Sequence, residues 1–386
     1  MDLLKEFYNV YGVNNNEVRV FFSAGRVNLI GEHTDYNGGY VFPAALSVGT
    51  TVLIRKRDDS KILLYATDLK TKVEADLNNI DSYKNLPWGN YQLGVVKELI
   101  ELSYNVGGCE MLFHDTVPHG AGLSSSAAIE CATGIAVYSI FNDKPIDKVE
   151  LAFIGQRAEN RYVGVNCGIM DQFASSMGKK DHAIFLNTKT MDYEYVPLNL
   201  QNYKIVISNT NKKRSLADSK YNQRRNECEQ GLKALQNEIS VQTLGDVSKE
   251  QFEQYKYLIE DEIIRKRVEH VVYEDYRVLK SIEVLNNGDL IEFGKLMFES
   301  HYSLKNLYEV TGIELDTLVE EASKIQGVIG SRMTGAGFGG CTVSIVHKDA
   351  IDEFKQKVGE NYYKKTNLKA DFYVFDIDDG AREIKV

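Results

Sequence analysis

The sequence predicts an α/β protein, in which strand-like and helix-like segments alternate along the chain. Two junctions carry this prediction. Residues 110–116 alternate apolar and polar side chains as a strand does, and a loop of glycines and serines then leads into the nearly apolar, helix-like run 127–136. Earlier, the strand-like run 18–24 leads into a polar stretch that contains four glycines. The length of 386 residues favours about two or three domains with a large core.

The composition is that of an ordinary globular protein, with 43% hydrophobic and 26% charged residues. A formal net charge of −10 argues against a nucleic-acid or anionic-membrane partner, so an anionic ligand would need a local site and a helping cation. No apolar run approaches the length of a membrane span, and the first residues show no basic-then-apolar targeting pattern. The five cysteines are scattered without Cys-x-x-Cys spacing, so we expect free thiols in a reducing cytoplasm.

The first half of the chain is expected to begin with a helix and continue as strands. Residues 1–20 predict a helix that carries Leu3, Leu4 and Phe7, followed by a turn. A strand meander is predicted over 40–75. A helix to about Leu102 follows the only tryptophan, Trp88, and another helix is predicted over 148–163.

The stretch 25–39 reads Gly-Arg-Val-Asn-Leu-Ile-Gly-Glu-His-Thr-Asp-Tyr-Asn-Gly-Gly and is crowded with polar groups. Three interpretations are open at this point. It could be a polar loop rich in turn residues. It could bind a polyhydroxylated ligand, because carboxylates and imidazole bind hydroxyls at fixed angles. A metal site at Glu32, His33 and Asp35 is the third, although ligands so close together in a loop fit no common template.

The stretch 117–128 reads Val-Pro-His-Gly-Ala-Gly-Leu-Ser-Ser-Ser-Ala-Ala and joins a strand to a helix. Glycines let the backbone approach a ligand, and the free N–H groups of a first helical turn attract anions, so the loop predicts a phosphate site. An ordinary serine N-cap is the simpler alternative. No Gly-Lys-Ser/Thr follows, and Ser125 stands where the dinucleotide fingerprint has its third glycine, so both of those motifs are excluded.

Two carboxylates in the 148–178 region need an explanation. Glu159 continues the inward face of its predicted helix and must therefore find a partner, either Arg157 or Arg161 or a bound cation. Asp171 has the apolar neighbours Met170 and Phe173, so it is expected to be shielded from water, where its electrostatic effect grows. A helix-capping role for Asp171 is the alternative.

A boundary is expected near 197–200, after which the chain becomes more helical. Long charged helices are predicted from about Ser215 to Leu285, with Lys220, Arg224 and Arg225 on a solvated face. The glycines of the segment 331–340 match a dinucleotide pattern, but a strand follows where a helix should, so this match is discarded. The other elements predicted here are a strand at 203–209, helices near 289–306, 314–325 and 351–362, and a strand at 370–375.

Three motifs together, at 25–35, 118–128 and 334–340, resemble the GHMP small-molecule kinases, and the stretch 25–39 resembles the galactokinase signature within that superfamily. The resemblance extends over essentially the whole chain. It implies a two-domain fold with the active site in the cleft between the domains. Residues 1–198 would form an N-terminal domain of mixed sheet and helices, and residues 199–386 a ferredoxin-like C-terminal domain.

The resemblance also implies roles for individual residues. Asp171 matches the catalytic carboxylate, and Arg26 the basic group between it and the phosphates. Ser126 and Glu159 match the ligands of Mg²⁺, and the segment 334–340 would brace the phosphate loop. The sugar pocket would be lined by Glu32, His33, Thr34, Asp35, Gly168 and Tyr221, and the ATP phosphates would be held by Gly120, Ala121, Gly122, Leu123, Ser124, Ser125 and Ser126.

The implied reaction is transfer of the γ-phosphoryl group of MgATP to the anomeric hydroxyl of galactose. Asp171 would accept or orient the hydroxyl proton, and a monomer is expected. Three alternatives were weighed. A kinase for another sugar, such as N-acetylgalactosamine or arabinose, stays open. A catalytically inactive sensor of galactose and ATP is disfavoured by the intact Asp171, Arg26 and Ser126–Ala127. A protein kinase is excluded, because no His-Arg-Asp or Asp-Phe-Gly run exists.

Overall fold

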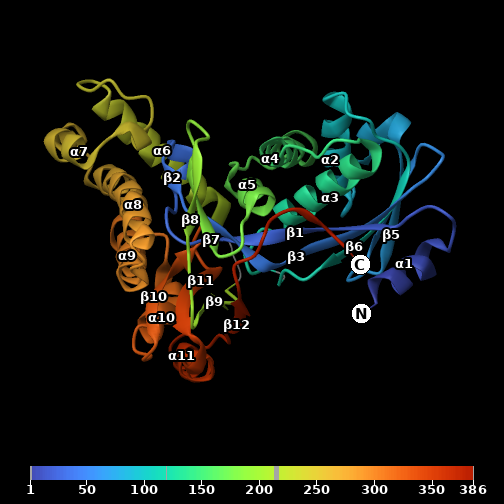
Figure 1. The fold of residues 1–386 in the computed structure, drawn as a ribbon. Helices are drawn as coiled ribbons and strands as arrows, with labels where there is room; N and C mark the ends of the chain where they lie inside the picture. Colours follow the sequence, from blue (N-terminus) through green and yellow to red (C-terminus); the bar gives the residue numbers. More distant parts are fainter. Residues whose placement is uncertain (1, 119, 213–216, 386) are drawn as a thin grey trace.

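The structure is a computed structural model that describes residues 2–118, 120–212 and 217–385. His119 of the predicted phosphate loop and the predicted helix start near Ser215 therefore lie outside the described residues. Figure 1 shows a broad sheet with helices above it on one side, and a second sheet with its own helices below and to the left.

The larger sheet has six strands in the order β13-β1-β3-β6-β4-β5. Only β4 and β6 pair in parallel, so the sheet is mixed, as expected. Helices α2 (Asn90–Glu101), α3 (Ser125–Phe141) and α4 (Lys148–Arg157) cover one face (Figure 1). The strands are β1 (Arg19–Asn28), β3 (Pro43–Lys56), β4 (Lys61–Ala66), β5 (Thr71–Asp76), β6 (Cys109–Asp115) and β13 (Arg382–Ile384), with α1 (Leu3–Tyr11) packed outside them.

Strand β1 is longer than predicted, and this changes the interpretation of the first polar stretch. Residues 25–28 were expected to be loop, but they pair with the start of β3 after a bulge between Ala24 and Arg26. Every residue of β1 after Arg19 is buried. Arg26 is therefore fixed by a strand, which restricts its side chain more than a loop would. The irregular part of the stretch begins only after Asn28.

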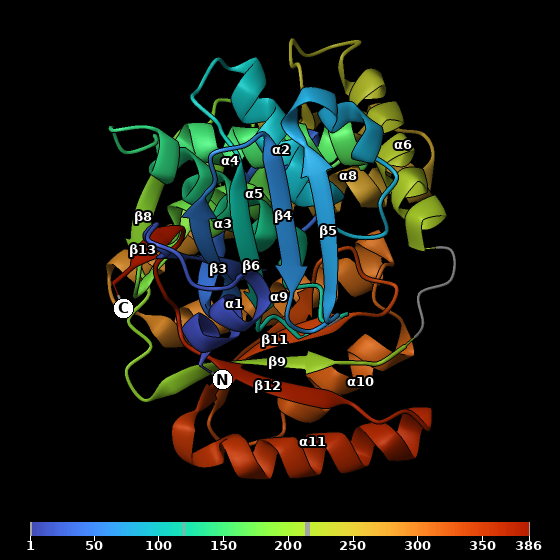
Figure 2. The same cartoon turned by 90° about the vertical axis from the view of Figure 1, so that its right-hand side faces the viewer.

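The smaller main sheet has four antiparallel strands in the order β10-β11-β9-β12. Along the chain the order is strand, helices, two strands, helix, strand, which is the ferredoxin-like arrangement. Figure 2 shows α11 against the outer face of this sheet. The expected ferredoxin-like fold is thus confirmed. Its elements are β9 (Tyr203–Asn209), α6 (Ala217–Leu235), α7 (Lys249–Tyr255), α8 (Glu262–Asn286), α9 (Leu290–Ser303), α10 (Gly312–Ala322), β10 (Val328–Thr334), β11 (Cys341–His347), α11 (Ile351–Thr366) and β12 (Asp371–Phe375).

A third sheet of three strands lies between the two larger ones and was not predicted. It contains β2 (Tyr40–Val41), β7 (His182–Asn187) and β8 (Tyr193–Pro197), and helix α5 (Met170–Met177) precedes β7. Strand β13 was also missed, and it returns the end of the chain to the first sheet beside β1. We retain the division near residue 198 as a proposal for the two main sheets, with β13 on the N-terminal side.

The two main sheets share a hydrophobic core. One cluster joins Leu29 and Phe42 of the first half to Ile207, Phe293 and Val343 of the second. The rings of Phe42 and Phe293 meet at 6.1 Å, edge to face, and both are fully buried. Burying such a ring contributes about 1.5–3 kcal/mol, so the core holds the halves in one relative position.

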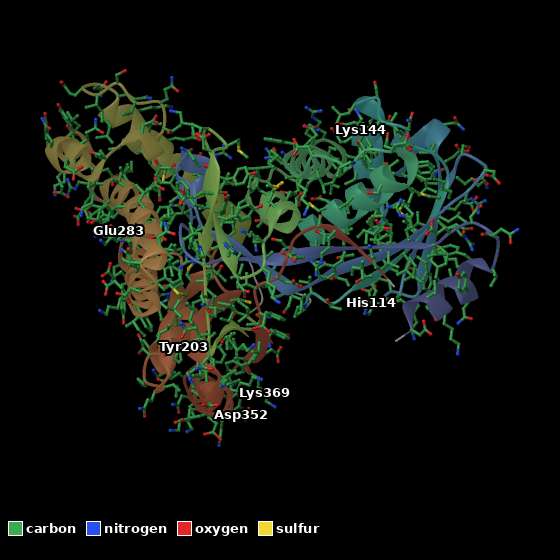
Figure 3. All side chains as sticks on the ribbon, viewed as in Figure 1. His114, Lys144, Tyr203, Glu283, Asp352 and Lys369 are labelled. Atoms are coloured by element: carbon green, nitrogen blue, oxygen red, sulfur yellow. The ribbon has the colours of Figure 1, made fainter. Side chains whose placement is uncertain are left out.

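The exterior carries charges of both signs. Lys144, Glu283, Asp352 and Lys369 are labelled in Figure 3 and lie at the rim of the molecule, where they are exposed. Within the described ranges, no helix combines the length and the apolar character that crossing a bilayer requires.

Candidate active site

The centre of the site is an ion pair between Arg26 on β1 and Asp171 on α5. Arg26 Nε donates to Asp171 Oδ1 at 2.8 Å, and Arg26 Nη2 donates to Asp171 Oδ2 at 2.7 Å. The Ser124 hydroxyl donates to Oδ2 as well, at 2.6 Å. The remaining nitrogen, Arg26 Nη1, donates to the Gly122 carbonyl at 2.9 Å. One guanidinium thus ties the carboxylate to the glycine–serine loop.

Asp171 keeps room for one further donor. A carboxylate offers about four lone-pair positions, and the contacts from described residues use three of them, which leaves one for a ligand. The Asp171 side chain is 30% exposed, whereas that of Arg26 is 9% exposed. The carboxylate is held in one orientation but remains accessible to a ligand.

The loop 120–126 has the geometry of an anion site. Gly120, Gly122 and Ser124 all adopt positive φ, at 72°, 66° and 58°. Ser124 occupies the N-cap position of α3, but its side chain makes no capping bond, because its hydroxyl goes to Asp171. The simple N-cap interpretation is therefore wrong for Ser124. The first-turn N–H groups of α3, which have no intrahelical partners, are left for a ligand.

Asp35, Gly168 and Tyr221 lie close to one another. A Cβ on Gly168 would stand 2.9 Å from Asp35 Oδ2, so the glycine directly faces the carboxylate. Burial, together with the charges of Glu32 and Asp171, raises the pKa of Asp35 to about 6. Burial also raises the pKa of Tyr221, and the Asp35 carboxylate adds to this effect. These groups and Asp171 are therefore electrostatic neighbours.

His33 and Thr34 occupy different kinds of position. The His33 ring lies 5.6 Å from the Tyr221 ring and is 4% exposed, and its Nε2 is buried. Burial lowers the pKa of His33 to about 3, so the imidazole is neutral. Thr34 is fully buried, and its hydroxyl lies 2.9 Å from the Gly31 carbonyl and 2.6 Å from that of Tyr40. Thr34 thus supports the turn, and its place in the sugar pocket stays a prediction.

Glu32 connects the first polar stretch to the third glycine segment. Its Oε1 accepts from the Gly335 N–H at 2.8 Å and from the Thr334 hydroxyl at 3.0 Å, and Arg332 Nη1 lies 3.4 Å away. The Thr334 hydroxyl also lies 3.1 Å from the Asn28 carbonyl. These bonds hold the first stretch, and the predicted brace on the phosphate loop stays a prediction.

Glu159 lies in a π-helical turn, Ala158–Val163, and faces inward as predicted. Its partner is Gln172, whose Nε2 donates to Glu159 Oε2 at 2.7 Å and to Glu130 Oε2 at 2.9 Å. Neither arginine considered from the sequence fills this role, since Arg157 pairs with Glu98 and Glu150 instead. Glu130 Oε1 and Gln172 Oε1 are buried, with no partner among the described residues.

Binding of a magnesium ion by Ser126 and Glu159 together with ATP stays a prediction. A Ser126 hydroxyl and a Glu159 carboxylate supply the oxygen donors that Mg²⁺ prefers, and Mg²⁺ usually takes one or two such groups plus substrate phosphates. Burial raises the pKa of Glu159, while Asp171 and Arg26 act on it in opposite directions, which places it near the ion pair. The described part of the chain contains no cluster of three His, Cys, Asp or Glu side chains that could hold a metal without phosphate.

Several residues that shape the site were missed from the sequence. Glu274 on α8 is fully buried, and its Oε1 accepts from the N–H groups of Gly31 and Glu32 at 2.9 and 3.3 Å. Burial alone would raise the pKa of Glu274, but surroundings led by the charge of Arg277 lower it to about 2. Nothing distinguishes Glu274 within a charged helix. Glu130 did give a signal, because it is the only carboxylate in the apolar run 127–136.

Arg224 was expected on a solvated face, and this was wrong. It is 6% exposed, and its Nε donates to the Tyr308 carbonyl at 2.6 Å, while Arg225 and Lys220 are exposed. The guanidinium anchors α6, which carries Tyr221, to the π-helical turn Leu304–Tyr308. The (i, i+3) pair with Glu227 at 3.1 Å balances its charge.

Comparison with known families and proteins agrees with this geometry. The galactokinase galactose-binding signature matches residues 5–56, the GHMP kinases N terminal domain matches 90–179, and the GHMP kinases C terminal domain matches 281–364. A galactokinase of Clostridium tetani is 52% identical over 383 residues, covering 99% of this chain and 97% of the relative. A Bacillus subtilis galactokinase is 49% identical over 382 residues, covering 98% of this chain and 97% of the relative.

Solved structures give the same result. Lactococcus lactis galactokinase complexed with galactose superposes with a TM-score of 0.92 at 44% identity, covering 99% of each chain. Methanococcus jannaschii mevalonate kinase, at 20% identity, shares the fold with a TM-score of 0.67, covering 95% of this chain and 99% of that one. The chain therefore belongs to the galactokinase family of the GHMP kinases and is an ATP-dependent sugar kinase.

Proposed function

We propose that this kinase transfers the γ-phosphoryl group of MgATP to the C1 hydroxyl of galactose through a site centred on Asp171. The observation that carries the proposal is the position of this carboxylate. It touches Ser124 of the glycine–serine loop and is an electrostatic neighbour of Asp35 and Tyr221. A sugar bound beside Asp35 and Tyr221 and ATP bound along the glycine–serine loop would meet at Asp171.

A sugar hydroxyl both donates and accepts hydrogen bonds, and the proposed sugar site offers partners for both. Asp35 and Glu32 offer acceptors, while His33 and Tyr221 are neutral groups with polar atoms available. The absence of a side chain at Gly168 leaves the space beside Asp35 open. Such a site rejects an analogue with an inverted hydroxyl, because a buried polar group is then left unpaired. Thr34 would act by fixing the turn rather than by contact.

The phosphates of ATP would lie along residues 120–126. The N-terminal end of α3 supplies backbone N–H groups and the positive end of a helix dipole. An acidic protein with a net charge of −10 repels anions overall, so it needs a local site of this kind to bind phosphates. The support is geometric, since the positive φ values of Gly120 and Gly122 open the loop.

Ser126 and Glu159 would hold Mg²⁺, with Gln172 orienting the Glu159 carboxylate. When bound, the ion would neutralise charge on the β- and γ-phosphoryl oxygens.

In the chemical step, the C1 oxygen of the sugar forms a bond to the γ-phosphorus, and the bond from that phosphorus to the bridging β–γ oxygen breaks. ADP leaves with the electron pair of the broken bond. The remaining lone-pair position of the Asp171 carboxylate accepts the hydrogen bond of the C1 hydroxyl and then its proton. Arg26 offsets the negative charge on this carboxylate and on the transferred group. Because three donors already stabilise Asp171, its main contribution would be to orient and polarise the hydroxyl.

Two further proposals concern partners and location. We expect the enzyme to act as a monomer with galactose and ATP, without nucleic acid, because every residue proposed here for the site belongs to one chain. The five cysteines form no disulfide, which is consistent with a reducing cytoplasm.

The test is Mg²⁺- and ATP-dependent release of ADP with galactose, glucose, N-acetylgalactosamine and arabinose. We expect turnover on galactose and at most slow turnover on the others. Efficient turnover only on another sugar would retain the mechanism and refute the substrate. Absence of turnover, with galactose and ATP still raising the melting temperature, would point instead to a sensor.

A further inference from the structure

A line of hydrogen-bonding side chains runs from His33 into the interior. His33 Nδ1 lies 2.8 Å from Tyr36 Oη, which lies 2.7 Å from Tyr308 Oη. Tyr308 Oη in turn lies 3.1 Å from Cys228 Sγ. Tyr308 ends the π-helical turn after α9, and Cys228 lies on α6, so three separate segments of the polypeptide contribute to this hydrogen-bond chain. Tyr308 and Cys228 are fully buried, which shields the chain from water.

Every group in this chain is electrically neutral near pH 7. Burial lowers the pKa of His33 to about 3. Burial raises the pKa of both tyrosines well above the ordinary value, and it raises the pKa of the Cys228 thiol to about 12. The hydrogen-bond chain from His33 to Cys228 therefore contains one imidazole N–H, two phenol O–H groups and one thiol S–H.

Three hydrogen bonds among four groups with one proton each can be arranged in four ways, according to which group's proton stays outside these bonds. Two of the four leave the O–H of Tyr36 or of Tyr308 without an acceptor in the interior, which costs free energy, so two arrangements remain. In the first, the thiol donates to Tyr308, Tyr308 donates to Tyr36, and Tyr36 donates to His33 Nδ1. The imidazole proton is then on Nε2. In the second, every donor is reversed, so that Nδ1 carries the proton and the phenol of Tyr308 donates to sulfur.

The strengths of the acceptors separate the two arrangements. An imidazole nitrogen is a good acceptor, and sulfur is a weak one. The first arrangement directs a phenol O–H to the imidazole nitrogen and asks only a weak donor, the S–H, to serve at the far end. The second directs a phenol O–H to sulfur and leaves the S–H unused in the chain.

We propose that Tyr36, Tyr308 and Cys228 are positioning residues that fix His33 in the Nε2–H tautomer, so that His33 acts toward the sugar only as a hydrogen-bond donor. This inference deepens the proposed function and rests on the role of His33 in the sugar pocket. In the Nε2–H form this buried nitrogen would donate to a carbonyl such as that of Ala336, whose backbone hydrogen bond acts on the His33 pKa, or to a sugar oxygen that takes its place when galactose binds.

The fixed donor complements the Asp35 carboxylate. Above its pKa of about 6, Asp35 is ionised and can only accept. A sugar that fits must therefore accept from His33 at one hydroxyl and donate to Asp35 at another. An imidazole that exchanged freely between tautomers would not impose the first of these conditions.

The experiment is ¹⁵N–¹H NMR of the ligand-free enzyme labelled at its seven histidines, because the two ring nitrogens have distinct shifts when protonated or not. The His33→Asn variant assigns the His33 signals. We expect Nε2 protonated and Nδ1 unprotonated near pH 7. In Tyr36→Phe, Nδ1 loses its donor, so the signals should shift toward the Nδ1–H form, and galactose affinity should fall about three- to tenfold, with ATP affinity within about twofold of wild type.

Tyr362→Phe is the matched control. Tyr362 is also fully buried, and its hydroxyl donates to the Thr210 carbonyl at 2.7 Å, so it takes no part in the hydrogen bonds that lead to His33. The control should leave the His33 signals and the galactose affinity unchanged. An Nδ1–H tautomer or an imidazolium in the wild type, or unchanged His33 signals in Tyr36→Phe, would overturn the proposal. If the wild type does not turn over galactose, the proposed function is overturned instead, because the tautomer is measured without any substrate.

Discussion

Replacing Arg26 with lysine tests the linkage between the candidate catalytic carboxylate and the phosphate loop. Lysine keeps the charge but has a single nitrogen on a flexible stem, so it cannot reproduce the planar fork through which three Arg26 nitrogens contact Asp171 and Gly122, and we take two of these contacts as lost. A hydrogen bond to a charged group contributes about 1.5–3 kcal/mol, and we discount this because the Asp171 side chain is 30% exposed. The loss is then about 2–4 kcal/mol of transition-state stabilisation, or roughly 30- to 1,000-fold in kcat/KM.

The same strand offers a matched control. Arg19 also makes a fork, with Nε 2.7 Å and Nη2 2.8 Å from the Glu383 carboxylate, and its Nη1 donates to the Ser139 carbonyl at 2.7 Å. Arg19→Lys therefore makes the same chemical change on β1, away from the site. Steady-state ADP release should show full activity in this control. The reasoning is refuted if Arg26→Lys retains kcat/KM within threefold of wild type, or if both variants lose activity equally.

Three other substitutions probe single features. Gly168→Ala places a Cβ 2.9 Å from Asp35 Oδ2, so KM for galactose should rise about tenfold with KM for ATP unchanged, and an unaltered galactose KM would contradict the pocket. Burial raises the pKa of Glu130, so the folded protein keeps this carboxyl protonated, and its contribution to the free energy of unfolding falls as pH rises above about 4.5. In denaturant unfolding, Glu130→Gln should therefore gain stability relative to wild type between pH 5 and pH 8. A difference that stays constant over this range would count against the argument. Glu274→Ala leaves the Gly31 N–H and buried charges unpaired and should lower the free energy of unfolding by about 3–5 kcal/mol, whereas a loss below about 1 kcal/mol would show that the contacts are not needed.

The local parts of the site could be predicted from the sequence. Glycines and serines between a strand and a helix predict an anion loop from backbone geometry alone, and the positive φ angles of Gly120, Gly122 and Ser124 agree with this, while anion binding stays a prediction. The inward direction of Glu159 follows from helical spacing, and its burial is confirmed. The overall fold, including the mixed and ferredoxin-like sheets, came from the resemblance of three motifs and is confirmed.

The contacts that join distant segments could not be predicted. Glu274 meets the Gly31 N–H across 243 positions of sequence, and nothing in α8 marks that residue over its charged neighbours. The side-chain contact of Ser124 could not be predicted either, because local propensity does not say where the side chain of a left-handed N-cap residue points. The structure directs it to Asp171. Strand β7 was missed because its burial pattern, with three of six residues only partly buried, lacks clear alternation in the sequence.

The central claim, that Asp171 orients and activates the sugar hydroxyl, is tested most directly by Asp171→Asn. Asparagine keeps the size of the side chain but removes its charge and one acceptor, so kcat on galactose should fall by at least about 100-fold. Galactose and ATP should still raise the melting temperature of the variant. A kcat within tenfold of wild type, with both ligands still binding, would contradict the account.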